Sequence, residues 1–167
     1  MACGPVAYPL FTSDRIAVIS VVWLMNSLMT YYTYFKDYEG DKQAGKRTII
    51  VKYGIEKARW IGIIFSFMPA VIFLLFYFNG FITVIPSRTF WILAALTLTL
   101  ELWTAYLYYK NPVGEKTYDS LAANFRACAC GQATFVALFN DQLALILFLI
   151  SYIFIGSLFG LHKNREA

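Results

Sequence analysis

The chain has 167 residues, an ordinary length for one soluble domain, but 59% of them are apolar and only 14% are charged. An average globular chain carries roughly 25% charged residues, and a protein this small cannot bury so much apolar surface because its surface-to-volume ratio demands a polar shell. With a formal net charge of only +4, the composition excludes a soluble enzyme, a disordered chain and a nucleic-acid-binding protein of the usual kind. We expect the lipid bilayer, and no nucleic acid, among its partners.

Charged residues divide the chain into five long stretches that are uncharged or nearly so. About twenty apolar residues in a helix cover the roughly 30 Å hydrocarbon core of a bilayer, whereas barrel strands need only about ten residues in strict alternation. We therefore predict an all-α polytopic membrane protein with about five transmembrane helices in a single membrane domain over residues 1–167. In chain order the predicted spans are 16–35, 60–82, 89–109, 121–139 and 142–161. The fourth is the most polar, since it holds Asn124, Arg126 and Gln132.

Lysine and arginine concentrate between the first two predicted spans. Seven of the fourteen lie there: Lys36, Lys42, Lys46, Arg47, Lys52, Lys57 and Arg59. The positive-inside rule predicts that this loop, 36–59, is cytoplasmic. Lys110 and Lys116 then fall on the same side, as do Lys163 and Arg165 near the carboxy terminus. We expect an integral membrane protein with its amino terminus outside and its carboxy terminus in the cytoplasm.

Two carboxylates in this loop, Asp37 and Asp41, are four residues apart. If the first helix continues by one turn, both lie on one face, where like charges repel unless a cation sits between them. Mg²⁺ prefers oxygen ligands and is typically held by one or two carboxylates plus substrate phosphates. Lys42, Lys46 and Arg47 could take the remaining charge of a diphosphate. The alternatives are an ordinary charged loop that obeys the topology rule, or a basic cluster that binds anionic lipid head groups.

The run 34–54, YFKDYEGDKQAGKRTIIVKYG, resembles the second aspartate-rich motif of the UbiA-type intramembrane prenyltransferases. That motif pairs D-x-x-G-D with a following Gly, a Ser or Thr, and a further Gly. Here these are Asp37, Gly40, Asp41, Gly45, Thr48 and Gly54. Lys36 before the first Asp and Glu39 within the motif also look familial, and the stretch 124–139 resembles a late helix of the family more weakly.

The resemblance implies a helical bundle around a central cavity. In that family two aspartate-rich motifs hold Mg²⁺, which binds the diphosphate of an isoprenoid donor, and the allylic carbon then alkylates an aromatic or lipid acceptor. The resemblance thus implies Mg²⁺ on Asp37 and Asp41, and an isoprenoid diphosphate on Lys42, Lys46 and Arg47.

Polar and aromatic residues that precede the motif are candidates for lining such a cavity. Asn26 lies three helical turns before the first motif aspartate, and Tyr34 and Lys36 are closer to it. Asn26 could equally form a hydrogen bond between helices. Tyr31 and Tyr32 could steady an allylic cation by cation–π contact, or could be interface or lipid-facing tyrosines.

The family's first aspartate-rich motif, N-D-x-x-D-x-x-x-D, does not occur in the sequence. The other acidic pair four apart, Glu115 and Asp119, lacks its glycine, basic and asparagine context. The chain therefore resembles the carboxy-terminal half of a UbiA-type bundle, and its first residues, 1–5, resemble a loop between helices. With about half of the metal ligands, we do not expect this chain to catalyse prenyl transfer alone.

Two functional hypotheses follow. The chain is either part of a Mg²⁺-dependent prenyltransferase whose other half is an amino-terminal portion or a partner membrane protein, or an inactive truncated homologue that serves as a small helical subunit of a larger membrane complex, such as one that holds pigments or quinones. Glu101 and Arg126 are two further charges within predicted spans. We expect them to face the bundle interior, paired with one another or with groups in missing helices. Cys128 and Cys130 are interpreted as small packing residues.

Overall fold

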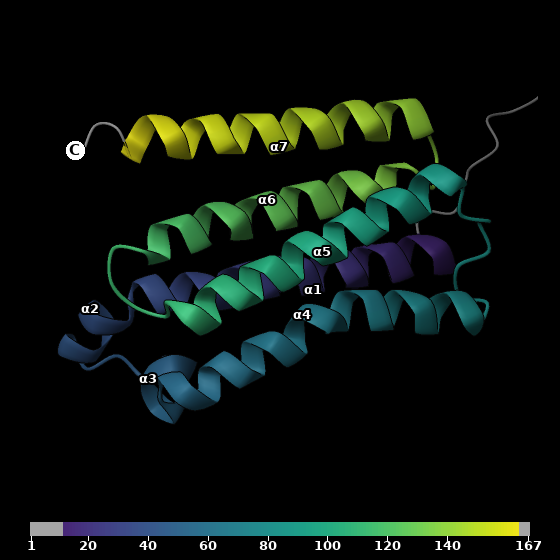
Figure 1. Cartoon of the computed structure of the whole chain (residues 1–167). Helices are drawn as coiled ribbons and strands as arrows, with labels where there is room; N and C mark the ends of the chain where they lie inside the picture. The colour runs from purple at the N-terminus through teal and green to yellow at the C-terminus, as the bar shows by residue number, and fades with distance from the viewer. Residues whose placement is uncertain (1–11, 164–167) are drawn as a thin grey trace, which may run out of the picture.

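The computed structural model describes residues 12–163, and this part of the chain is built from helices connected by short segments (Figure 1). The described helices are α1 Ser13–Lys36, α2 Tyr38–Gln43, α3 Ile49–Tyr53, α4 Ile55–Phe78, α5 Arg88–Lys110, α6 Thr117–Val136 and α7 Asp141–Lys163. The predicted all-α fold is confirmed. Predictions that concern residues 1–5, the amino terminus and Arg165 lie outside the described residues.

The five long helices lie side by side and alternate in direction (Figure 1). The α4–α5, α5–α6 and α6–α7 connections are short, whereas α1 is joined to α4 through α2 and α3. The short helices α2 and α3 lie at one end of the bundle, together with the α5–α6 connection and the last turn of α7. The α4–α5 and α6–α7 connections lie at the opposite end. The loop 36–59, Lys110 and Lys116 are therefore at the same end, as predicted from the charges. The assignment of this end of the bundle to the cytoplasm stays a prediction.

The helix bounds differ from the predicted spans in the region of the motif. The loop 36–59 is largely helical: only Asp37 separates α1 from α2, and α4 begins at Ile55 instead of residue 60. The same helix ends at Phe78 instead of residue 82, because Gly80 adopts φ 74°, a left-handed conformation that does not continue an α-helix. Figure 1 shows α4 bent near its middle, where Pro69 lacks the N–H that a straight helix requires.

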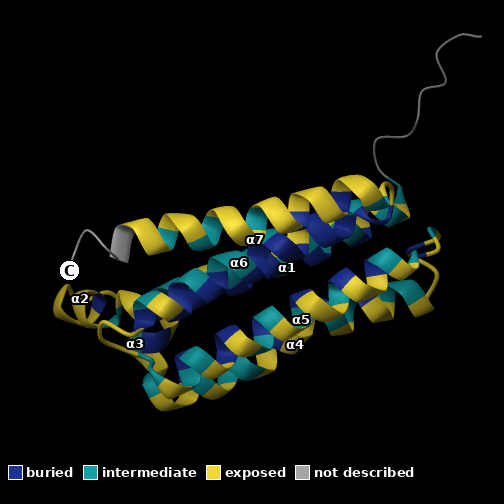
Figure 2. Cartoon of the chain, turned by 45° about the horizontal axis from the view of Figure 1, so that its top comes forward, coloured by how far each residue is buried: buried dark blue, intermediate teal, exposed yellow. Residues whose placement is uncertain are grey.

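Helix α6 is the most polar of the five long helices, as predicted, and it runs between the same two ends of the bundle as the others (Figure 1). Among the described helices, α1, α4, α5 and α7 are long and apolar enough to cross a bilayer, and α6 is not in this group. It packs against α1, α5 and α7, and Figure 2 shows its ribbon mostly buried while α7 is mostly exposed. A helix enclosed by protein can hold small and polar residues, which pack closely and form hydrogen bonds between helices. Its polarity therefore follows from its central position.

The buried side chains form two clusters along the bundle. One lies near α2 and α3 and joins α1 to α4 and α5, and the other fills the middle and the opposite end. In the first cluster the Tyr32 ring stacks on Tyr108 at 4.7 Å between centroids, and its hydroxyl lies 2.9 Å from Oγ of Ser66. The Tyr31 hydroxyl donates to the Ala58 carbonyl at 2.7 Å. Tyr31 and Tyr32 are thus core tyrosines that hold α1 against α4 and α5. The predicted interface or lipid-facing position is wrong for both, and contact with an allylic cation stays a prediction.

Candidate functional site

Asp37 lies at the junction of α1 and α2, and its backbone keeps the two motif carboxylates one helical turn apart. Helix α1 ends at Lys36, so Asp37 and Asp41 do not lie within one continuous helix. The Asp41 N–H nevertheless donates to the Asp37 carbonyl at 2.8 Å, which is the bonding of an α-helical turn. The i, i+4 relation expected from the sequence therefore persists across the junction.

The two carboxylates differ in their surroundings. Asp41 is buried, and its Oδ1 accepts a hydrogen bond from Nζ of Lys46 at 2.8 Å. Its other oxygen has no hydrogen bond within the described part of the chain. Asp37 is exposed at the surface of the bundle end. The hydrogen bond that Lys46 donates to Asp41 and the charge of that carboxylate, with a smaller contribution from the Asp37 charge, raise the pKa of Lys46 above its ordinary value.

Gly45 makes the contact between Lys46 and Asp41 possible. It adopts φ 67°, a left-handed conformation that side chains rarely tolerate, and it follows the last residues of α2. The chain reverses there, so that the Lys46 N–H also donates to the Asp41 carbonyl at 2.9 Å. The glycine of the motif is thus explained by a turn that wraps the basic segment back over the second aspartate.

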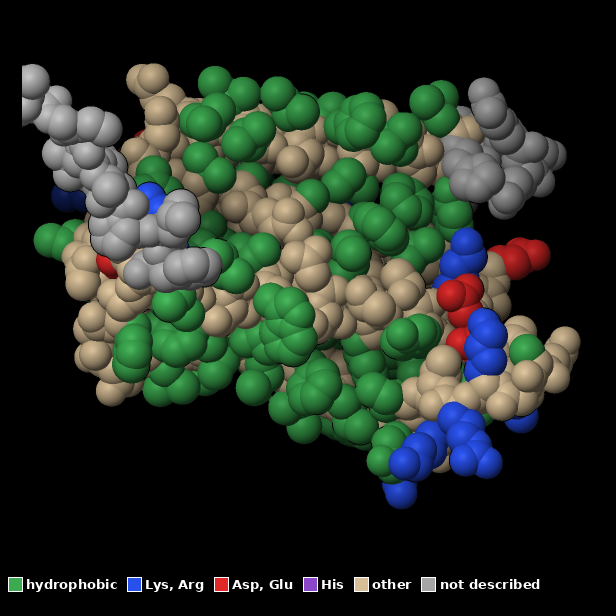
Figure 3. Space-filling view, turned by 180° about the vertical axis from the view of Figure 1, so that it is seen from behind, with side chains coloured by type: hydrophobic (Ala, Val, Ile, Leu, Met, Phe, Trp, Pro, Cys, Tyr) green, Lys and Arg blue, Asp and Glu red, His purple; other side chains and the backbone are tan. Residues whose placement is uncertain are grey.

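The predicted diphosphate-binding cations lie at this end of the bundle, and Figure 3 shows Lys and Arg gathered there with Asp and Glu. Nζ of Lys42 lies 5.7 Å from the Tyr38 ring centroid. Nζ of Lys36 lies at the same distance from the Tyr118 ring of α6. Arg47 is exposed and makes no hydrogen bond or ion pair with another described residue. The structure thus brings together Asp37, Asp41 and Lys46 and leaves Arg47 open to solvent.

Asn26 forms hydrogen bonds between helices in the middle of the bundle. Its Oδ1 accepts from Nε2 of Gln132 at 3.1 Å and from the Cys128 thiol at 3.8 Å, both on α6. Tyr34 is half-buried against the first core cluster, and Lys36 is exposed. A substrate-lining role for Asn26, Tyr34 and Lys36 stays a prediction.

A polar stripe on α1, which we call the α1 polar face, runs from Asn26 to the motif. It consists of Asn26, Thr30, Thr33 and Asp37, at spacings of four, three and four, and each of them is half or fully exposed. Residues at these spacings share one helix face. The threonine hydroxyls bond to backbone carbonyls of the preceding turn. The spacing is readable in the sequence, yet the prediction singled out only its first and last members.

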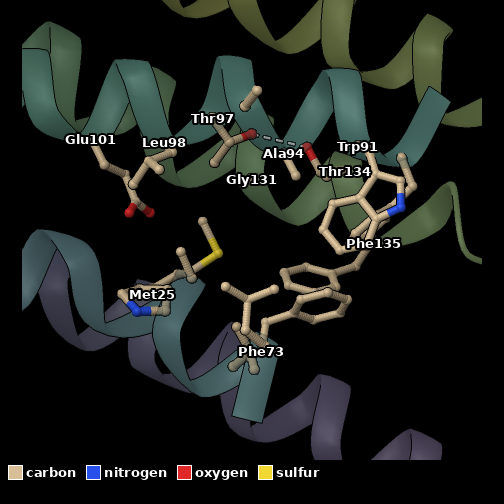
Figure 4. A pocket seen from close by; sticks show the side chains of 16 residues that line it. Met25, Phe73, Trp91, Ala94, Thr97, Leu98, Glu101, Gly131, Thr134 and Phe135 are labelled. Carbon is tan, nitrogen blue, oxygen red and sulfur yellow. Dashed lines mark hydrogen bonds between the residues drawn. The ribbon is translucent and has the colours of Figure 1, made fainter. Parts of the chain in front are cut away.

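A cavity of about 230 Å³ lies between α1, α4, α5 and α6, away from the motif. Figure 4 shows Glu101 at one end of it and the rings of Phe73, Trp91 and Phe135 toward the other. Glu101 is buried and has no hydrogen bond or ion pair with any other described residue. Sequence reasoning identified Glu101 as an intramembrane charge but had no signal for the cavity.

Arg126 corrects the expected pairing of the two intramembrane charges. Its Nε donates to the Tyr152 carbonyl of α7 at 3.3 Å, and its guanidinium lies 4.9 Å from the Tyr152 ring centroid. A Cβ added at Gly156 would overlap the guanidinium, so this glycine makes room for it. Arg126 thus fastens α7 to α6 and does not pair with Glu101.

The described residues contain no group of three or more His, Cys, Asp or Glu side chains that could enclose a metal ion. The motif offers two carboxylates one turn apart, one exposed and one with an oxygen that no described residue bonds. This donor set suits Mg²⁺, which keeps waters and completes its shell with phosphate oxygens. The residues present therefore fit a magnesium ion shared with a phosphorylated ligand.

A family model, described as the UbiA prenyltransferase family, matches residues 2–129. No curated protein and no solved structure matches the chain. The matched segment includes the aspartate motif, all of α1 to α5 and most of α6, whereas α7 lies beyond it. Since the match covers well over half of the 167 residues, the chain belongs to the UbiA prenyltransferase family.

Proposed function

We propose that this chain supplies the Asp37–Asp41 part of a Mg²⁺-dependent site that binds an isoprenoid diphosphate for prenyl transfer to an aromatic or lipid acceptor. Membership of the UbiA prenyltransferase family supports the class of reaction. The observation that carries the site is the pair of carboxylates one turn apart at the polar end of a membrane bundle, with Lys46 on one of them. Carboxylates of further helices would complete the metal shell.

In this proposal the acidic residues of the motif hold the metal ion and the basic residues contact the diphosphate. Mg²⁺, when bound to Asp37 and Asp41, supplies neutralisation of the charge that develops on the leaving diphosphate. The Lys46 side chain is 65% exposed, so it can move from Asp41 to a phosphate oxygen without a large desolvation cost. Arg47 has a free planar guanidinium, which suits bidentate contact with phosphate.

The position of the motif at the end of the bundle suits a donor with a charged head and an apolar tail. The diphosphate would stay at the polar end, where Lys and Arg gather (Figure 3), while the isoprenoid chain would extend into the bilayer region beside α1. A charged head within the hydrocarbon core would be costly, so the bundle end is the place where both parts of the donor find suitable surroundings.

The α1 polar face favours a second candidate function, a helical subunit of a larger membrane complex that does not catalyse. Asn26 bonds to α6, and the hydroxyls of Thr30 and Thr33 bond to carbonyls of α1, so none of these three side chains lacks a hydrogen bond. Such a face can pack against a neighbouring helix in either function. The two candidates differ in whether the motif binds a diphosphate in a Mg²⁺-dependent manner.

Binding of geranyl diphosphate to the full chain in lipid nanodiscs, with Mg²⁺ or with a chelator, separates the candidates. We expect Mg²⁺-dependent binding that weakens at least about tenfold in the Asp37→Asn/Asp41→Asn variant, because charge-assisted contacts are worth roughly 1.5–3 kcal/mol each. The matched control is Glu115→Gln/Asp119→Asn, the other acidic pair four apart, at the same end of the bundle. Equal binding by both variants, or no effect of Mg²⁺, would overturn the prenyl-transfer proposal and favour the subunit.

A further inference from the structure

The cavity inside the bundle is separate from the motif and has a different chemistry. Its lining is apolar except for Glu101 at one end and Thr97 and Thr134 along one wall (Figure 4). The two threonine hydroxyls lie 2.9 Å apart and bond to each other, and the Thr134 hydroxyl also donates to a backbone carbonyl. Glu101 is therefore the buried lining group that retains unused hydrogen-bonding capacity among the described residues, and the indole N–H of the exposed Trp91 also makes no hydrogen bond.

The exposed part of the cavity lining belongs to α4 and α5. Of the lining side chains, Leu74 on α4 and Trp91 and Ala95 on α5 are exposed, whereas those from α1 and α6 are buried. Both α4 and α5 are candidate membrane spans. The opening therefore faces the lipid-accessible surface of the bundle, and a ligand would reach Glu101 from within the bilayer.

Small residues and a proline kink in α4 create this space. The side chains at Ala94 and Ala95 are single methyl groups. Pro69, which also lines the cavity, breaks the hydrogen-bond ladder of α4 where the helix bends (Figure 1). A volume of about 230 Å³ lies below the roughly 300–1,000 Å³ of sites for drug-sized ligands. The space suits one slender chain or one ring.

We propose that this cavity binds a slender membrane-soluble molecule that ends in a hydroxyl group, with the hydroxyl on Glu101 and the hydrocarbon part among Phe73, Phe90 and Trp91. An ionised carboxylate without a cation is costly in apolar surroundings. A carboxylic acid both donates and accepts a hydrogen bond, as a hydroxyl does. A phosphate is excluded by the acidic group and the apolar lining, so this site does not serve the diphosphate and does not depend on the proposed function.

The direct test is photolabelling of the full chain in nanodiscs with a dodecanol that carries a mid-chain diazirine, compared with the matching dodecane probe. We expect the alcohol to label peptides of α4 and α5 around the cavity more than α7, the exposed helix that serves as an internal control for lipid contact. Unlabelled dodecanol should compete about five- to tenfold better than dodecane, the effect of one hydrogen bond to a buried group. Equal competition, or labels spread evenly over the lipid-facing helices, would overturn the proposal.

Three variants locate the ligand within the cavity. Glu101→Leu should remove the preference for the alcohol over the alkane, and Glu101→Gln, which keeps a donor and an acceptor, should retain most of it. Ala94→Leu should fill the space and abolish labelling of the cavity by both probes. An alcohol preference unchanged in Glu101→Leu would contradict the role of this carboxyl, and stronger competition by dodecylamine than by dodecanol would overturn the hydroxyl assignment. Size-exclusion profiles and helical circular dichroism identify a variant that fails to fold, in which case competition on the unaltered chain decides.

Discussion

Asp41 and Glu101 are almost equally buried, at 5% and 4% exposure, yet the two regions that hold them differ in the charged and hydrogen-bonding neighbours that they offer to a carboxylate. Asp41 lies at the polar end of the bundle and accepts a hydrogen bond from Lys46, with further cations on the same segment. Glu101 lies in the middle of the bundle, faces an apolar cavity and has no ion-pair partner in the described chain. Burial alone therefore does not indicate what an acidic residue does in this protein.

The difference separates binding of an anion from binding of a neutral molecule. At the polar end, exposed Lys and Arg side chains can exchange a carboxylate for a phosphate at little cost, because water screens each state. In the middle of the bundle, close packing between α1, α5 and α6 fixes the positions of side chains and excludes charge. We therefore expect stability to depend on residues of the bundle middle, and anion binding to depend on residues of the polar end.

The largest expected effect on stability is at Gly131, which packs tightly against Met25 of α1 and Thr97 of α5. A Cβ at this position would overlap the Met25 side chain and approach Thr97 Cγ2 within 2.9 Å. Gly131→Leu should therefore destabilise the bundle by about 1–3 kcal/mol or more, the usual cost of overpacking a core. Gly160→Leu on α7 is the matched control, since nothing lies within 4 Å of its added Cβ. Unfolding in detergent, followed by circular dichroism, should show a lower midpoint for Gly131→Leu alone. Equal midpoints for the two variants would contradict tight packing at Gly131.

A smaller effect is expected at Tyr32, whose hydroxyl is buried against Ser66. Tyr32→Phe keeps the ring stacked on Tyr108 but leaves Ser66 with one partner fewer, which should cost about 1 kcal/mol. Tyr106→Phe on the exposed surface of α5 is the control and should leave the unfolding midpoint unchanged. If the two variants unfolded alike, the buried tyrosine cluster would not be the contact that holds α1 to α4.

The smallest effect concerns the pH response of the polar end. Because the Asp41 hydrogen bond raises the pKa of Lys46, this pair stabilises the fold below the ordinary lysine pKa, and the contribution is lost as pH rises through the raised pKa. Titration of Lys46 Nζ by NMR should give a pKa above 10.5, the ordinary value, and Asp41→Asn should return it toward that value. The unfolding midpoint of Asp41→Asn should change little at pH 7. An unshifted Lys46 in the unaltered chain would contradict the observed contact.

Much of the architecture could be predicted from the positions of charged residues. The spacing of charges indicated the five long helices and the shared end of the motif loop and the α5–α6 connection, because charge is costly within lipid. It did not indicate which helix is enclosed by protein, and the low hydropathy of α6 reflects its contacts with α1, α5 and α7. The motif letters indicated Asp37 and Asp41, but their different exposure depends on the turn at Gly45.

Contacts between particular helices could not be predicted from the sequence. Periodicity indicates which residues share a face but not which neighbour that face meets. Glu101 and Arg126 could therefore be expected in the interior, whereas the partner of Arg126 on α7 and the cavity beside Glu101 depend on how α4, α5, α6 and α7 pack. Tyr31 and Tyr32 likewise became core residues only once α4 and α5 were placed beside α1.

Electron paramagnetic resonance of Mn²⁺, a spectroscopic substitute for Mg²⁺, tests the assignment of the aspartate motif most directly. The measurement uses the full chain in nanodiscs with inorganic diphosphate present. If Asp37 and Asp41 hold the metal ion, we expect a bound Mn²⁺ coupled to ³¹P, which is lost in Asp37→Asn/Asp41→Asn and retained in Glu115→Gln/Asp119→Asn. The same bound signal in both variants, or no bound Mn²⁺ in the unaltered chain, would contradict this assignment.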